Sequence, residues 1–141
     1  VYRQADKFDQ AAAILEKLRA AGLMTDEKDY RQLYTTYANM DGKEKEVIAV
    51  INDGMQKGIL KPDQQTYLAL AQSYYYSDQI PPAIDAWKKA APLSKDGETY
   101  LNLAKVLWQE DRIPEAKQAA KSALEKGLKK PDEAKKIIAL P

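Results

Sequence analysis

The chain has 141 residues and nearly balanced charge, with 22 Lys and Arg against 21 Asp and Glu, so net charge gives no attraction to nucleic acid or to an anionic membrane. It contains no Cys and no His, which excludes disulfides, thiolate metal sites and the most common general base of enzymes. Its longest apolar runs, Ala11 to Leu15 and Val47 to Ile51, are far shorter than the ~20 residues of a membrane-spanning helix, so we expect no membrane insertion by this chain.

The first predicted element is an amphipathic helix over Asp9 to Ala21. Its apolar side chains recur at helical spacing and form one face, whereas Glu16 and Arg19 are expected on the side away from that face. Gly22 follows the last turn, where glycine commonly ends a helix. The pattern therefore predicts a helix whose charged side chains face solvent.

Further helices follow at short intervals. One is expected to be capped by Thr25-Asp26 and to continue to Met40, and the next covers about Lys43 to Gln56. Pro62-Asp63 opens the helix after that, and Pro131-Asp132 opens a last short helix. Turn residues separate all of these segments, so the chain is expected to be all-α.

The middle of the chain repeats itself at an offset of 33 residues. The packing positions of the first copy are Tyr67, Leu70, Ala71, Tyr74, Ala83, Trp87 and Ala90. They recur as Tyr100, Leu103, Ala104, Leu107, Ala116, Ala120 and Ala123. The turn residues Asp78, Ile80 and Pro81 recur at the same offset as Asp111, Ile113 and Pro114. Self-similarity at this period predicts a solenoid of stacked helical hairpins.

Weaker copies precede this pair. Val47, Ile51 and Gly54 lie 36 residues before Ala83, Trp87 and Ala90, and a further step of 36 reaches the N-terminal helix. That helix is then the second helix of a repeat whose first helix is missing, and we interpret the chain as a fragment of a longer protein, lacking any targeting segment. We predict one solenoid domain, 1–141, made of a truncated repeat (1–24), repeats 25–62, 63–95 and 96–130, and a capping helix (131–141).

These positions resemble the tetratricopeptide repeat over essentially the whole chain. In that family an aromatic residue is followed by Leu, a small residue and a second aromatic in the first helix, and by Ala, an aromatic and Ala in the second. The usual Trp is replaced here by Tyr67 or Tyr100. The resemblance implies a right-handed superhelix of antiparallel helix pairs, with a concave groove that holds a peptide or a partner segment.

Three longer segments resemble a narrower group, the bacterial tetratricopeptide proteins linked to the TonB energy-transduction system. These segments are Asp26-Glu-Lys-Asp-Tyr-Arg-Gln-Leu-Tyr, Gly58-Ile-Leu-Lys-Pro-Asp and Asp96-Gly-Glu-Thr-Tyr-Leu-Asn-Leu-Ala. This resemblance implies a protein of a Gram-negative bacterium that serves envelope transport, periplasmic rather than cytoplasmic.

The first helices of the repeats carry a second stripe of side chains, at spacings of four and three residues, which places each set along one line of a helix. We call the stripe and its neighbours the groove residues: Lys28, Arg31, Thr35, Leu68, Gln72, Tyr75, Tyr76, Leu101, Asn102, Lys105 and Trp108. Large aromatics often dominate binding energy, so we expect a protein or peptide partner here. The same spacing would also allow Tyr76 and Trp108 to be packing residues between helices.

The chemistry of enzyme sites is missing from the sequence. Without His or Cys no nucleophile–base pair can be assembled, and the glycines stand at helix ends instead of forming a phosphate-binding loop. Acidic pairs such as Asp132-Glu133 stand at helix starts, where they complement the helix dipole. We therefore predict a non-enzymatic interaction scaffold that needs no metal or cofactor.

An alternative is recognition of single-stranded RNA. The segments Gly58-Ile-Leu-Lys-Pro-Asp and Thr66-Tyr67 also resemble pentatricopeptide repeats, which bind one base per repeat. That code needs a polar residue after the Thr-Tyr pair, and this chain has Leu68 and Leu101 there. Leucine cannot hydrogen-bond a base edge, so a protein partner is favoured and no nucleic acid is expected.

Overall fold

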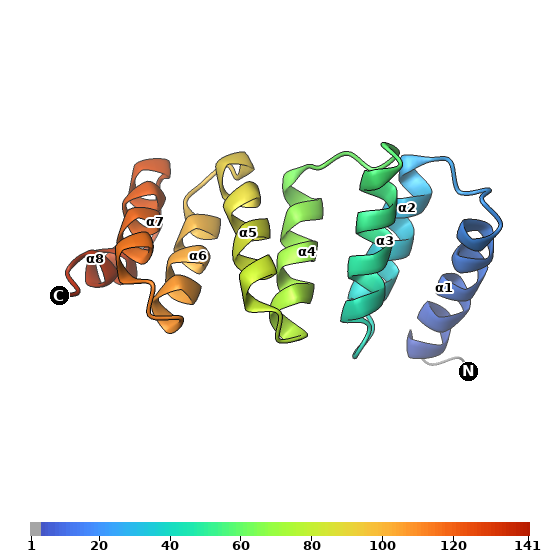
Figure 1. Ribbon diagram of the computed structural model, residues 1–141, viewed down its shortest axis with the longest axis horizontal. Helices are drawn as coiled ribbons and strands as arrows, with labels where there is room; N and C mark the ends of the chain where they lie inside the picture. Colours follow the sequence, from blue (N-terminus) through green and yellow to red (C-terminus); the bar gives the residue numbers. More distant parts are fainter. Residues whose placement is uncertain (1–3) are drawn as a thin grey trace. The chain divides into compact units, whose positions relative to one another are not determined.

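The computed structural model describes residues 4–141, which form α-helices and one short 3-10 helix, with no strand in that range (Figure 1). The elements are α1 (Gln4–Ala20), α2 (Glu27–Ala38), α3 (Glu44–Gln56), α4 (Gln64–Tyr76), α5 (Ile80–Ala90), η1 (Ala91–Leu93), α6 (Glu98–Gln109), α7 (Ile113–Lys126) and α8 (Asp132–Ile138). The predicted all-α class is confirmed. No helix within residues 4–141 has both the length and the apolar composition needed to cross a membrane.

The helix bounds lie within two residues of the predicted ones, as at the end of α2, which is Ala38 instead of Met40, except at the start of α1. α1 begins at Gln4 instead of Asp9, because helical geometry continues through polar residues that the apolar pattern does not mark. Asp26 occupies the N-cap position of α2, but its side chain makes no cap hydrogen bond. Two carboxylates in the first turn, Glu27 and Asp29, instead complement the positive end of the helix dipole.

Four helices end in the same backbone turn. A residue shortly after the helix has a positive φ and donates its N–H to the carbonyl three residues back, and the next residue donates to the carbonyl five residues back. The positive-φ residues are Gly22, Gly58, Asp78 and Asp111, with φ of 72°, 72°, 63° and 59°. Asp78 and Asp111 are 33 residues apart in the sequence, so the two copies share backbone geometry as well as packing residues.

The chain divides into two compact units. Unit 1 comprises residues 1–62, described from residue 4, together with 72–79. Unit 2 comprises residues 63–71 and 80–141, so α4 contributes its first part to unit 2 and its last part to unit 1.

Unit 1 has an aromatic core. α2 packs against α1 and α3, and three tyrosines of α2, Tyr30, Tyr34 and Tyr37, are buried between them. The residue of α3 that faces Tyr30 must be small. A Cβ added at Gly54 would lie 2.8 Å from Cδ1 of Tyr30 and 2.9 Å from Cβ of Leu60. A glycine therefore permits the close contact between α2 and α3.

Unit 2 has a core rich in alanine. α6 and α7 form an antiparallel pair, α5 packs on α6, and α8 packs on both α6 and α7 (Figure 1). Fully buried alanines lie along these contacts: Ala83, Ala90, Ala104, Ala116, Ala120, Ala123 and Ala134. Such small side chains let helices approach to about 8–10 Å between axes. The backbone of α7 also comes close to Gly97, where an added Cβ would overlap the carbonyl group of Ala123.

The segment between α5 and α6 is tied to three parts of unit 2 through Ser94. The amide of Gln64 donates to Ser94 Oγ (2.9 Å), and Ser94 Oγ lies 2.7 Å from the hydroxyl of Thr99. Lys126 Nζ donates to the Ser94 carbonyl (2.8 Å), and next to it the N–H of Gly97 donates to the carbonyl of Gly127 (2.8 Å). These bonds fix where α6 starts relative to the end of α7.

Candidate functional site

The groove residues divide between the two units. In unit 1, Lys28 and Thr35 of α2 are exposed and Arg31 is half-buried between them. The guanidinium of Arg31 pairs with Glu27 (3.5 Å) and donates to the hydroxyl of Tyr34 (3.4 Å). The positive charge of Arg31 is therefore partly neutralised within α2 itself.

Aromatic groove residues gather at the end of α4 in unit 1. The rings of Tyr75 and Tyr76 meet edge to face, with centroids 5.5 Å apart and planes at 83°. Tyr76 is 74% exposed and Gln72 is exposed, whereas Tyr75 is half-buried. Tyr76 is thus a surface residue, held by its neighbour in sequence, and not a packing residue between helices.

In unit 2, four groove residues lie on α6 and one on α4. Leu101 was predicted on the groove surface, and this is wrong, because its side chain is only 5% exposed. α6 contacts α5, α7 and α8, so more than one of its faces is covered. Asn102 and Trp108 are exposed, and Leu68 and Lys105 are half-buried.

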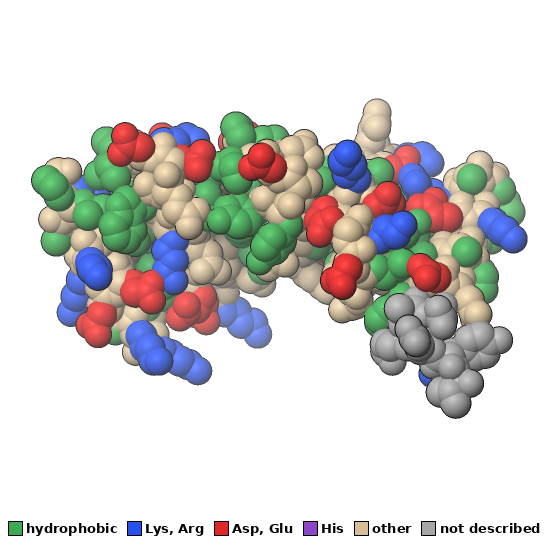
Figure 2. All heavy atoms as spheres, turned by 90° about the horizontal axis from the view of Figure 1, so that it is seen from below, with side chains coloured by type: hydrophobic (Ala, Val, Ile, Leu, Met, Phe, Trp, Pro, Cys, Tyr) green, Lys and Arg blue, Asp and Glu red, His purple; other side chains and the backbone are tan. Residues whose placement is uncertain are grey.

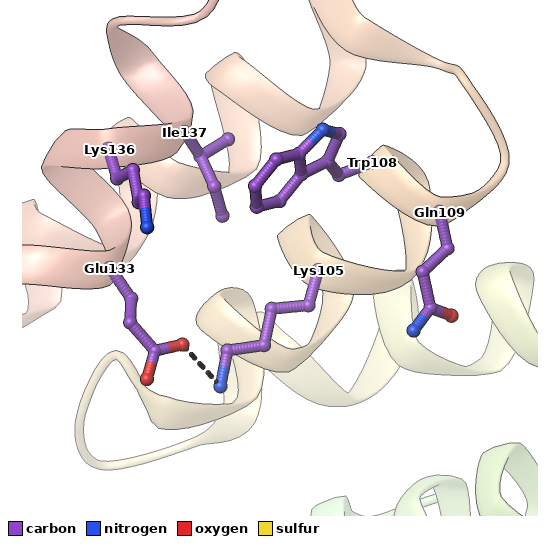
Figure 3. A pocket seen from close by; sticks show the side chains of 6 residues that line it. All are labelled: Lys105, Trp108, Gln109, Glu133, Lys136 and Ile137. Atoms are coloured by element: carbon purple, nitrogen blue, oxygen red, sulfur yellow. Dashed lines mark ion pairs between the residues drawn. The ribbon is translucent and has the colours of Figure 1, made fainter.

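The structure brings Lys105 and Trp108 together at an open cavity of about 680 Å³. Residues of α6 and α8 line it: Lys105, Trp108, Gln109, Glu133, Lys136 and Ile137 (Figure 3). Trp108 and Ile137 supply its apolar wall, and Trp108 remains 40% exposed although it lies beside the buried Ile137. The cavity therefore presents part of an indole ring to solvent.

Charged side chains border this apolar wall. Lys105 Nζ lies 2.7 Å from Glu133 Oε2 and reaches across from α6 to α8 (Figure 3). The hydrogen bond from Lys105 and its charge hold the pKa of the Glu133 carboxyl below its usual value, so this carboxyl is ionised at neutral pH. Both side chains are partly open to solvent, and ion pairs in contact with solvent contribute little to stability. An incoming ligand can therefore exchange this pair for its own at small cost.

Sequence reasoning missed the α8 side of the cavity. Glu133, Lys136 and Ile137 belong to the helix that was predicted only as a cap. The repeat contained the necessary signal, because a helix that follows one hairpin packs beside the first helix of that hairpin. α8 does contact α6, and so it shares a surface with Lys105 and Trp108.

Other kinds of site are not supported in the part of the chain that the structure describes. Its acidic side chains form no group of three or more that could hold a metal ion. On the face drawn in Figure 2, basic and acidic side chains are intermixed with apolar ones. Among known proteins, neither a family model nor a curated sequence matches this chain.

Proposed function

We propose that the chain is a non-enzymatic scaffold of the tetratricopeptide type, and that the cavity between α6 and α8 holds a segment of a partner protein. One observation carries this proposal: the indole of Trp108 is 40% exposed at the wall of an open cavity of about 680 Å³. Aromatic side chains in such positions are typical anchors at protein interfaces, and concave, partly apolar surfaces are the usual binding sites.

The finer fold proposal is a right-handed superhelix of helix pairs. The 33-residue repeat and the matching turns at Asp78 and Asp111 support it, since stacked copies of one hairpin generate a solenoid. The resemblance to tetratricopeptide proteins of the TonB system suggests a partner in bacterial envelope transport.

The cavity lining indicates the chemistry of the partner segment. Trp108 and Ile137 offer an apolar contact, and Lys105 and Lys136 outnumber the single carboxylate, Glu133. A bulky apolar side chain with an aspartate or glutamate nearby would match both features, because the carboxylate can replace Glu133 as the partner of Lys105. We therefore expect an acidic and apolar segment.

Selection from a displayed random-peptide library tests this function. The whole chain is the bait, and peptides that bind the bare support are removed. The surviving peptides should share a bulky apolar residue next to an acidic one. Each should lose about thirtyfold or more in affinity, roughly 2 kcal/mol, with Trp108→Ala, and less than about fivefold with Lys105→Ala, because the ion pair of Lys105 is open to solvent. Thermal melts of both variants show whether the fold is intact.

Two results would contradict the proposal. Peptides that bind wild type and Trp108→Ala equally, while both melt alike, would remove Trp108 from the site. The second result would come from a mobility-shift assay with mixed single-stranded RNA. Tight, sequence-selective binding at physiological salt would instead support the pentatricopeptide alternative.

A further inference from the structure

A second cavity in unit 2 has a volume of about 280 Å³ and shares no lining residue with the Trp108 cavity. It is formed by one residue of α5 and by α6 and α7: Lys88, Tyr100, Leu103, Leu107, Glu115, Gln118, Ala119 and Ser122. Leu103, Leu107 and Ala119 are buried and make an apolar floor, whereas Lys88, Glu115 and Gln118 are exposed at its border. The space far exceeds the ~30 Å³ that one water molecule occupies in the liquid, so a side chain can enter.

The preceding repeat shows what occupies the corresponding place. At the offset of 33 residues, Tyr100 corresponds to Tyr67 and Ser122 corresponds to Lys89. Lys89 Nζ lies 5.8 Å from the centroid of the Tyr67 ring, which is within the range of a cation–π interaction. Ser122 is short and uncharged and cannot make that contact with Tyr100. The repeat 96–130 therefore keeps the aromatic ring and lacks the cation.

We propose that this cavity binds a lysine side chain of a partner polypeptide, with its ammonium group over the ring of Tyr100 as Lys89 lies over Tyr67. This site is separate from the Trp108 cavity. Its occupant is inferred from the contact between Lys89 and Tyr67 and not from the exposure of Trp108.

The lining suits both parts of a lysine side chain. The methylene stem can lie on the apolar floor of Leu103, Leu107 and Ala119, as long charged side chains do when their heads stay near water. The face of the Tyr100 ring carries the negative part of its quadrupole, which attracts a cation. An aliphatic stem with a positive end is thus complementary to the floor and to the ring.

The two fixed cations beside the cavity are both engaged by one carboxylate. Lys88 and Arg112 are both held by the carboxylate of Glu115, at 3.1 and 2.8 Å. The hydrogen bond from Arg112, and then that from Lys88, hold the pKa of Glu115 below its usual value, so this carboxylate is ionised at neutral pH. Both cations are therefore paired with a carboxylate that itself lines the cavity.

Titration of the whole chain with Nα-acetyl-lysine N-methylamide, followed by NMR of backbone amides, tests the site. Shifts are expected at Tyr100, Leu103 and Ser122. The norleucine analogue has the same stem without the charge and should bind about three to ten times more weakly. Equal binding of the two probes, or no shift at the cavity with either, would overturn the proposal.

Substitution of Ser122 supplies the matched variants. Ser122→Lys restores the arrangement of the preceding repeat, so the protein's own lysine should fill the cavity and weaken the probe about tenfold or more. Ser122→Ala should bind like wild type, and Glu125→Gln, which adds the same charge elsewhere on α7, should change binding less than twofold. Undiminished binding by Ser122→Lys would refute the inference. Trp108→Ala should not affect the lysine probe, which separates failure here from failure of the proposed function.

Discussion

The core of unit 1 is aromatic and bonded to charged side chains, whereas the core of unit 2 is alanine-rich. In unit 1, the hydroxyl of Tyr30 donates to Asp53 (2.9 Å) and that of Tyr37 donates to Glu16 (2.9 Å). Arg19 joins the two carboxylates, at 3.0 Å from Glu16 and 3.4 Å from Asp53. In unit 2, fully buried alanines such as Ala104 and Ala120 bring helices together without side-chain hydrogen bonds.

The difference teaches which property each unit depends on. Burying a tyrosine hydroxyl or a carboxylate is costly unless a partner satisfies it, so the contacts of unit 1 depend on complete hydrogen bonding and on protonation state. Close contact of alanine faces depends instead on the absence of any extra atom. Volume changes should therefore be most damaging in unit 2, and removal of polar atoms or changes of pH in unit 1.

The largest effect is expected for Gly97→Ala in unit 2. The new Cβ would overlap the carbonyl of Ala123, a backbone group that can move only if α7 moves. We expect a loss of about 3 kcal/mol in the free energy of unfolding, at the upper end for overpacking. Gly54→Ala in unit 1 should cost about half as much, because its Cβ meets side chains, Tyr30 and Leu60. Chemical denaturation measures both, and equal midpoints for Gly97→Ala and wild type would contradict the prediction.

Ala104→Leu should destabilise unit 2 by about 2 kcal/mol through overpacking of α6 against its neighbours. Ala104 is fully buried, and the preceding repeat keeps the same small residue at Ala71. Lys121→Leu at an exposed position of α7, also in unit 2, is the control and should change stability by less than about 0.5 kcal/mol. Tryptophan fluorescence in urea suits the measurement, since Trp87 and Trp108 both belong to unit 2. Similar losses of unfolding free energy for the two variants would show that close packing at Ala104 does not determine the stability of unit 2.

Removal of a single hydroxyl should matter in unit 1. Tyr30→Phe takes away the hydrogen bond to Asp53 and should cost about 1.5 kcal/mol, as expected for a bond to a charged acceptor. Tyr67→Phe in unit 2, where the ring contacts Lys89, should stay within about 0.5 kcal/mol of wild type. A double-mutant cycle of Tyr30→Phe with Asp53→Asn isolates the interaction. A coupling energy near zero would mean that the hydrogen bond does not stabilise the unit.

Alkaline pH should lower the free energy of unfolding of unit 1 before that of unit 2. This is the smallest effect among the four predictions. Burial, and then hydrogen bonding to the nearby carboxylate, raises the pKa of Tyr30 and of Tyr37. A raised pKa gives stability that is complete below the unfolded pKa of about 10 and is lost as pH rises toward the folded value. By pH 10 the loss should be under about 1 kcal/mol. Urea titrations at pH 7, 9 and 10 can follow methyl shifts of Ile51 for unit 1 and tryptophan fluorescence for unit 2. Equal responses of both probes would count against this prediction.

The pH below which unit 1 loses stability is set by the carboxyl of Asp53. Burial alone would raise the pKa of its carboxyl, but hydrogen bonds from Tyr30, Lys57 and Arg19, with the charge of Lys57, bring the pKa below its usual value. A lowered pKa gives stability that is present above the unfolded value of about 3.9 and is lost as pH falls through the folded value. The polar network of unit 1 is therefore expected to work best between about pH 4 and pH 10.

Much of the fold follows from local sequence. Apolar spacing, glycines and the repeated Asp-x-Ile-Pro turns give the helices and their ends, because each of these signals acts over a few residues. The short helix η1 was not predicted, since its Ala-Pro-Leu sequence has no helical period of its own. Positions of small residues were also visible: Gly54, Ala90 and Ala123 correspond in the repeat, and all three are buried.

The sites depend more on contacts between distant residues. Glu16 and Arg19 were expected away from the packing face, yet both are half-buried and reach Tyr37 and Asp53. The rotation of α1 against α2 and α3 decides this, and no local pattern contains it. Leu101 was misplaced for the same reason, because the number of helices around α6 determines how many of its faces are covered.

The hydrogen bonds around Ser94 constrain how the length of the chain could have changed in evolution. Loops between helices usually accept insertions, because their backbone is exposed and makes few bonds. The segment 91–97 is different: Ser94 and Gly97 bond to Gln64, Thr99, Lys126 and Gly127. One added residue would shift these groups out of register with their partners. Insertions in descendants of this chain should therefore be found at the exposed turns near 41–42 and 129–130, and not between α5 and α6.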